Sequence, residues 1–146
     1  MVVRAPNCVF CDIVADERPA QLVFESPEVV AFLDQRPLFP GHTLVVPRDH
    51  VDTLVDLPRH LIEPFFAAVQ TLAGAVRDAM HADGTFVAMN NVVSQSVLHL
   101  HTHVVPRRRK DGLRGFFWPR NKYESEDEMA RVAGAVRDAV ARVATA

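Results

Sequence analysis

The chain of 146 residues is long enough for one domain with a substantial hydrophobic core. Its 16 basic and 18 acidic residues give a net charge of −2, which argues against a general binder of polyanions such as nucleic acids. The sequence has no apolar run of about 18 residues that would span a membrane, no hydrophobic signal segment and only two cysteines, so we expect a protein of the reducing cytoplasm.

The first recognisable motif is a pair of cysteines, Cys8 and Cys11, separated by two residues. One interpretation is a redox pair, which predicts a disulfide between the two and a following helix within a βαβ unit. A second interpretation is that both cysteines are unreactive. A third is half of a tetrahedral zinc site, whose other two ligands must come from distant parts of the chain because none lies nearby.

The next segments are typical of β-structure. Short apolar runs at residues 22–26 and 29–34, joined at Ser26-Pro27-Glu28, predict a β-hairpin because serine and proline favour a tight connection. Residues 36–42 contain two prolines and a glycine and predict a loop. Residues 42–47 predict a third strand that ends at its proline, which cannot donate to a sheet ladder.

A change of period marks a long helix over residues 57–82. Apolar residues recur there every three or four positions, which is the pattern of one buried helix face. Pro58 suits the first turn, Pro64 predicts either a kink or a later start, and Asp83-Gly84 predicts the end. The apolar face is expected to consist of Ile62, Phe65, Phe66, Val69, Leu72, Ala73, Val76 and Met80.

The rest of the chain completes the predicted fold. Residues 85–91 and 96–106 predict two further strands, a loop follows around residues 112–123, and residues 126–143 predict a C-terminal helix. Strands that run together, with one inserted and one terminal helix, indicate the α+β class with an antiparallel sheet of about five strands. We expect a single domain over residues 1–146, with a C-terminal helical extension from about residue 113.

Three histidines alternate along the last predicted strand: His99, His101 and His103. Residues two apart on a strand point to the same face, so these imidazoles are expected to line about 13 Å of one side. The opposite side is expected to face the core and consists of Leu98, Leu100, Thr102 and Val104.

Burying three imidazoles without partners would be costly, so we expect this aligned set to have a functional role. Two kinds of function are open, one nucleophilic and one of metal binding. A neutral imidazole attacks phosphorus well when a hydrogen bond to its other nitrogen fixes one tautomer. Such a reaction also needs donors for the phosphate oxygens and an acid for the leaving group, and Gln95 and Ser96 are suitably close upstream. The alternative is a non-catalytic module that binds zinc and a nucleotide.

Two blocks of the sequence resemble a known family. The segment HLHTHVV, residues 99–105, is similar to the His-φ-His-φ-His-φ-φ signature (φ, apolar) of the histidine triad (HIT) superfamily, with Thr102 as the sole departure. Residues 32–50 resemble the family's upstream element of an acidic residue, a proline loop, Gly-His and a strand ending in proline. QSV before the triad resembles the Hint branch, which cleaves nucleoside phosphoramidates. HVVPR after it resembles Fhit-like and bacterial branches, which include dinucleoside polyphosphate hydrolases.

The resemblance implies a HIT-like fold and a nucleotidyl hydrolase or transferase. His101 would attack the α-phosphate of a nucleotide conjugate and form a covalent nucleotidyl-histidine, which water or phosphate then releases. His42, His103 and Ser96 would assist at the phosphate or leaving group. The nucleotide, expected to carry a purine, would contact Asp34 through its ribose, and its remaining contacts would be Phe10, Ile13, Phe32, Leu33, Asn90, Gln95 and Ser96.

The resemblance also implies a metal and a partner. Some family members have a leading Cys-X-X-Cys that joins two histidines around a structural zinc ion. By position, the four ligands here would be Cys8, Cys11, His50 and His99. A homodimer is expected, with the long helix and one sheet edge at the interface and with Phe65 or Phe66 facing the partner.

Overall fold

The computed structural model describes residues 1–113 and 120–144, so the predicted loop around Trp118-Pro119 lies partly outside the described residues. The chain divides into two compact units, Met1–Asp111 and Gly112–Ala146. In the second unit, helix α3 spans Glu126–Ala144. Its start after Ser125 is confirmed, because the Ser125 hydroxyl accepts a hydrogen bond of 3.1 Å from the Glu128 N–H.

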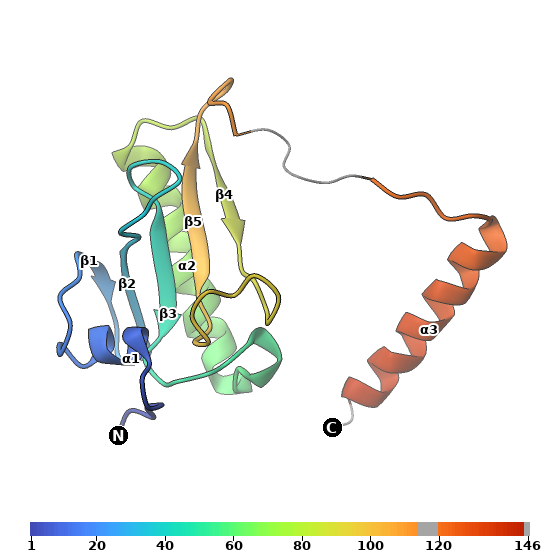
Figure 1. The fold of residues 1–146 in the computed structure, drawn as a ribbon, viewed down its shortest axis with the longest axis horizontal. Coiled ribbons are helices and arrows are strands. Elements are labelled where there is room, and N and C mark those ends of the chain that lie inside the picture. Colours follow the sequence, from blue (N-terminus) through green and yellow to red (C-terminus); the bar gives the residue numbers. More distant parts are fainter. Residues whose placement is uncertain (114–119, 145–146) are drawn as a thin grey trace. The chain divides into compact units, whose positions relative to one another are not determined.

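The first unit is built on a five-stranded antiparallel sheet with the strand order β1-β2-β3-β5-β4, as Figure 1 shows. The α+β class and the number of strands are confirmed. The predicted hairpin forms where expected, because the Ser26 hydroxyl accepts the Val29 N–H at 3.0 Å and closes the turn. The strands are β1 (Leu22–Glu25), β2 (Val29–Leu33), β3 (Thr43–Pro47), β4 (Gly84–Ala88) and β5 (Thr102–Arg107).

Both faces of the central strands are buried, each against a different helix. Val29, Ala31 and Val45 pack toward helix α2 (Arg59–Ala79), which runs along one face of the sheet in Figure 1. The alternate residues pack on the other face, where the short helix α1 (Val9–Val14) lies, and they are Val30, Phe32, Leu44 and Val46. The histidine side of the sheet is the α1 side.

Helix α2 is shorter than predicted, and a 3₁₀ turn at Leu54–Asp56 precedes it. The helix begins at Arg59, so the later start is wrong, and Pro64 lies within it at the loss of one backbone hydrogen bond. Phe65 is fully buried, whereas Ile62 and Phe66 are about 40% exposed, at 41% and 39%. Of the two phenylalanines expected at an interface, Phe65 is thus excluded and only Phe66 has exposed surface.

The end of α2 also differs from the prediction. Met80 caps the helix and His81 adopts a left-handed backbone with φ of 51°. Asp83-Gly84 does not end the helix, because the Asp83 N–H donates to the Arg107 carbonyl and Gly84 is already the first residue of β4. A sheet hydrogen bond has taken the place of the predicted glycine cap.

Strand β5 begins at Thr102, six residues later than predicted, so His99 and His101 precede it and only His103 lies within it. The backbone before Thr102 bonds elsewhere: the Leu100 N–H donates to the Val51 carbonyl, and the His99 carbonyl accepts from a side chain. The predicted faces still hold for Leu100 and Val104, both fully buried against α2, but Leu98 is 53% exposed.

Candidate functional site

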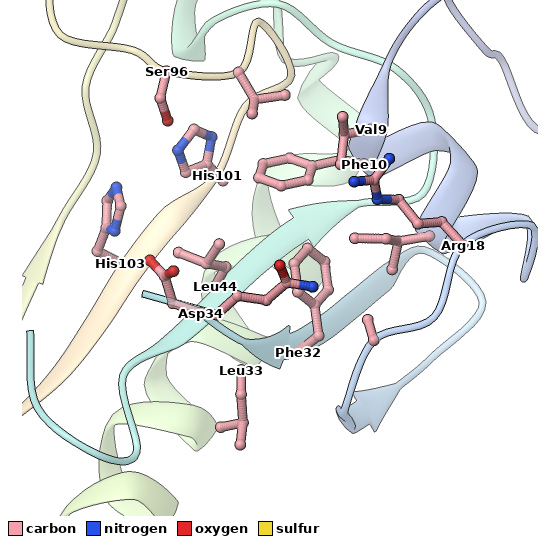
Figure 2. A pocket seen from close by; sticks show the side chains of 14 residues that line it. Val9, Phe10, Arg18, Phe32, Leu33, Asp34, Leu44, Ser96, His101 and His103 are labelled. Carbon is pink, nitrogen blue, oxygen red and sulfur yellow. The ribbon is translucent and has the colours of Figure 1, made fainter. Parts of the chain in front are cut away.

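A pocket opens on the α1 side of the sheet, and Figure 2 shows the side chains that line it. One end is apolar, where Phe10 and Phe32 meet edge to face with ring centroids 5.3 Å apart. The other end holds Asp34 and two of the histidines. The lining residues are Val9, Phe10, Ile13, Arg18, Ala20, Phe32, Leu33, Asp34, Gln35, Leu44, Ser96, Val97, His101 and His103.

His101 is held in one tautomer by the backbone. Its Nδ1 lies 2.8 Å from the His99 carbonyl oxygen, and because a carbonyl only accepts, Nδ1 carries the proton. The lone pair therefore resides on Nε2. Burial lowers the pKa of His101 below its ordinary value, so the ring is neutral at neutral pH. A buried neutral imidazole with one free lone pair in a pocket is a competent nucleophile.

Two linked hydrogen bonds hold His103 in the tautomer opposite to that of His101. The Leu38 N–H donates to His42 Nδ1 at 3.1 Å, so the proton of neutral His42 is on Nε2. His42 Nε2 then donates to His103 Nδ1 at 2.9 Å, which leaves the His103 proton on its own Nε2. His103 is therefore a hydrogen-bond donor at the pocket, next to the acceptor-type nitrogen of His101.

The loop between β2 and β3 brings His42 into place, and Gly41 is needed for its path. Gly41 has φ of +98°, and a Cβ there would lie 2.6 Å from Met80 Cγ. At the start of this loop, Asp34 Oδ1 accepts the Arg36 N–H at 2.8 Å. Asp34 Oδ2 is 3.7 Å from His42 Nε2.

The predicted contacts just upstream of the triad occupy different positions. Ser96 lines the pocket, and Figure 2 shows it beside His101. Gln95 is not among the lining residues: its amide donates to the Asp52 carbonyl at 2.7 Å and accepts the Val92 N–H at 2.8 Å. Asn90 donates to the Ser94 carbonyl at 3.2 Å. The two amides thus shape the loop that carries Ser96.

Two polar lining residues, Arg18 and Gln35, had not been singled out in the sequence. Arg18 lies in the turn between α1 and β1, and Gln35 begins the proline loop. Neither belongs to a spaced motif. Gln35 directly follows Asp34, so its neighbour was the signal that could have found it. Only the folding of α1 against the sheet brings Arg18 to the pocket, so sequence spacing carries no signal for Arg18.

Beside the pocket, the two cysteines meet two histidines. Cys8 Sγ lies 3.4 Å from His99 Nδ1, and Cys11 Sγ lies 3.4 Å from His50 Nδ1 and 3.6 Å from His99 Nδ1. All four ligand atoms lie within 4.8 Å of one another. Ligands of a tetrahedral zinc ion would be separated by about 3.6 Å, given ordinary Zn–S and Zn–N bond lengths. The two thiols are free rather than joined in a disulfide.

The outer contacts of this cluster also suit a metal ion. His99 Nε2 donates to the Pro47 carbonyl at 2.8 Å, and His50 Nε2 lies 2.7 Å from Asp52 Oδ1. These bonds leave both Nδ1 lone pairs directed at the cysteines, as metal-bound histidines require. Burial raises the pKa of Cys8 to about 11, so a bound cation is what would convert this thiol to a thiolate ligand. The residues present therefore fit a Cys₂His₂ metal site.

Protonation of His103 is expected to make the stability of the protein depend on pH. Burial lowers the pKa of His103 to about 4, below its ordinary 6.5, so the unfolded chain binds the proton first as the pH falls. The free energy of unfolding therefore falls as the pH drops from 6.5 toward 4, and His103 accounts for about 2 kcal/mol of this loss. Urea unfolding of the wild type and His103→Asn at pH 7 and pH 4.5 checks this. An equal loss in both proteins would contradict it.

Comparison with known proteins agrees with this geometry. A family model described as "HIT domain" matches residues 15–110. The chain is 37% identical to "Protein hit" of Bacillus subtilis, over 84% of this chain and 88% of that protein. A crystal structure of a HIT family member from Bacillus subtilis superposes with a TM-score of 0.84 at 32% identity, covering 90% of this chain and 96% of that one.

Other relatives carry more specific descriptions. A Zn-bound histidine triad family protein from Mycobacterium smegmatis is 38% identical with a TM-score of 0.70, covering 88% of this chain and 97% of that one. An adenosine 5′-monophosphoramidase of Saccharomyces cerevisiae is 35% identical, over 73% of this chain and 66% of that protein. An adenylylsulfatase of Arabidopsis thaliana is 31% identical, over 73% of this chain and 55% of that protein.

No helix among the described residues is both long and apolar enough to cross a membrane. The matching family model, the shared fold and the arrangement of the histidines lead to one conclusion. The chain belongs to the HIT family, whose members include nucleotide hydrolases.

Proposed function

We propose that this protein cleaves a nucleotide conjugate at its α-phosphate through a covalent nucleotidyl-histidine on His101. The observation that supports this most is the tautomer of His101, whose Nδ1 is tied to the His99 carbonyl at 2.8 Å. Its Nε2 is then available to phosphorus. The substrate classes are nucleoside phosphoramidates and dinucleoside polyphosphates.

The shape and polarity of the pocket suggest how the nucleotide binds. A planar base fits the apolar end, against Phe10 and Phe32. The ribose hydroxyls donate to Asp34 Oδ2, and the α-phosphate lies at the histidine end. There His103 Nε2–H donates to a phosphate oxygen as negative charge develops on it.

The reaction proceeds in two steps, formation of the nucleotidyl-histidine and its hydrolysis. The lone pair of His101 Nε2 attacks phosphorus, and the bond from phosphorus to the leaving nitrogen or oxygen breaks, with its electron pair going to the leaving atom. Ser96 donates a hydrogen bond to that atom, which takes its proton from solvent. The adduct is a cationic imidazolium, which the His99 carbonyl stabilises through Nδ1–H. Water then attacks phosphorus, releases a nucleoside monophosphate and a proton, and restores neutral His101.

We infer that the metal of the Cys₂His₂ cluster is zinc. The donor set and the spacing of the ligand atoms support this, as does the Zn-bound relative. When bound, zinc would cross-link α1 to the segments before α2 and β5. His99 would then serve two purposes, because its side chain is a ligand and its carbonyl orients His101.

A direct activity test separates the enzyme from the alternative, a non-catalytic module that binds zinc and a nucleotide. The protein is incubated with adenosine 5′-phosphoramidate and, separately, with a diadenosine polyphosphate. Chromatography then measures AMP. The proposal expects AMP from at least one conjugate, with zinc content unchanged. Nucleotide binding without any product would favour the module.

We further propose a homodimer that uses the outer face of α2. Ile62 and Phe66 leave large apolar surfaces exposed there, and Val87 does so on the edge strand β4. Phe66→Glu is expected to convert the dimer to a monomer, since a charge cannot be buried in an apolar contact. Light scattering after size exclusion measures the mass. His60→Glu, exposed and about 120° around the helix from Phe66, is the control, and a wild-type monomer would contradict the proposal.

A further inference from the structure

The apolar end of the pocket carries a cation that the proposed chemistry does not use. Arg18 lines the pocket together with Phe10, and in the view of Figure 2 it is drawn across Phe10 from His101 and His103. In this view Arg18 and the proposed phosphate chemistry at the histidines lie on opposite sides of Phe10. A nucleotide with its base at the apolar end and its phosphate at the histidines would therefore meet Arg18 through its base.

The guanidinium of Arg18 has its donors available. The neighbouring Arg4 is engaged by Asp12 and Glu17, with contacts of 3.1 Å and 2.6 Å. Within the ranges 1–113 and 120–144, by contrast, no hydrogen bond or ion pair engages the Arg18 side chain. An arginine presents five donors and no acceptor in a planar fork. The side chain of Arg18 would therefore favour a base that has two adjacent hydrogen-bond acceptors on one edge.

Purine bases differ at this edge. Guanine and hypoxanthine present two acceptors, N7 and O6, which an arginine binds with two hydrogen bonds. Adenine presents N7 beside an amino donor, which repels an arginine N–H. Gln35 has both a donor and an acceptor and accommodates either base. The only acidic side chain among the described lining residues is Asp34, at the ribose end, so no carboxylate stands ready for the adenine amino group.

We propose that Arg18 reads the N7/O6 edge of the base and makes this site prefer guanine and hypoxanthine nucleotides over adenine nucleotides. The inference rests on the proposed function, because it requires a base against Phe10 and Phe32 with its phosphate at the histidines. It assigns to the site a base preference that the histidine motif does not contain.

Calorimetric titration of the 146-residue chain with GMP, IMP and AMP tests this. These nucleotides are products of the proposed reaction, so binding is measured without turnover. GMP and IMP are expected to bind about fivefold more tightly than AMP, at the low end for a two-bond arginine contact because Arg18 is exposed. IMP lacks the guanine 2-amino group, so its agreement with GMP excludes that group and points to O6, where adenine has its amino donor.

Two variants isolate the cause. Arg18→Lys keeps the positive charge but loses the fork, so the GMP-to-AMP affinity ratio is expected to fall toward one. Arg59→Lys, on α2 and outside the pocket, is expected to keep the wild-type ratio. Equal wild-type affinities, or an equal loss for all three nucleotides in Arg18→Lys, would overturn the inference. If the nucleotides bind equally and conjugates are still cleaved, only the base preference fails. If none binds and none is cleaved, the proposed function fails as well.

Discussion

Replacement of His101 by asparagine is expected to lower kcat/KM for a nucleoside phosphoramidate by about 10⁴-fold or more. Asparagine retains a donor for the His99 carbonyl and much of the buried volume, but it has no nitrogen that can attack phosphorus. The melting temperature and the zinc content should therefore change little. Steady-state kinetics, calorimetry and metal analysis on the same preparations measure the three quantities.

Variants of two other histidines show whether the loss of activity is specific to His101. His103→Asn removes a donor rather than the nucleophile, so a loss of about 10²-fold to 10³-fold is expected. His60→Asn, on the exposed face of α2, should have wild-type activity. Activity of His101→Asn within tenfold of the wild type would contradict the assigned nucleophile. Loss of zinc in that variant would indicate instead that His101 is a metal ligand.

Removal of one cysteine ligand is expected to have the largest effect on stability. Cys11→Ser should lower the free energy of unfolding by about 3 kcal/mol and the melting temperature by about 10 °C, because the metal binds the folded state only. Cys11 is 1% exposed, and its cluster joins α1 to the segments before α2 and β5. Differential scanning calorimetry with metal analysis measures both effects.

Further variants distinguish the effect of losing the metal from the effect of losing one buried thiol. His50→Ala should cause a similar loss, and the double variant should lose little more, since the first substitution already releases the ion. Wild-type protein treated with a strong chelator should melt near the single variants, and His60→Ala should melt like the wild type. Additive losses, or a chelator without effect, would show that the four residues are stabilised by packing alone.

Local chemistry made much of the fold predictable. The turn residues at Ser26-Pro27-Glu28 set the first hairpin, and Ser125 begins α3, because both act within a few residues of themselves. The helical period located the buried face of α2 but could not choose between Phe65 and Phe66. Adjacent residues lie about 100° apart on a helix, so either could face the core, and only packing against the sheet decides.

Long-range backbone contacts account for most of the errors. The start of β5 depends on the Leu100 N–H finding the Val51 carbonyl, about fifty residues away, and on His101 occupying the His99 carbonyl. The end of α2 likewise depends on the contact from Asp83 to Arg107. Alternation nevertheless predicted the shared side of the histidines, because His99 and His101 still point toward α1 and Leu100 toward α2 even without ladder hydrogen bonds.

The candidate site was predicted unevenly. The grouping of Cys8 and Cys11 with two distant histidines came from a family resemblance, since the cysteine spacing alone left three interpretations open. Arg18 reaches the pocket only through the packing of α1 on the sheet, which no local pattern encodes.

The most direct test of the central claim is the mass of the protein during its first turnover. The enzyme is mixed with excess nucleoside phosphoramidate, quenched within milliseconds and examined intact, then as peptides. A mass increase of one nucleoside monophosphate group is predicted, located on His101 and absent from His101→Asn. Product formed in the first turnover without any adduct, or an adduct on another residue, would contradict the account.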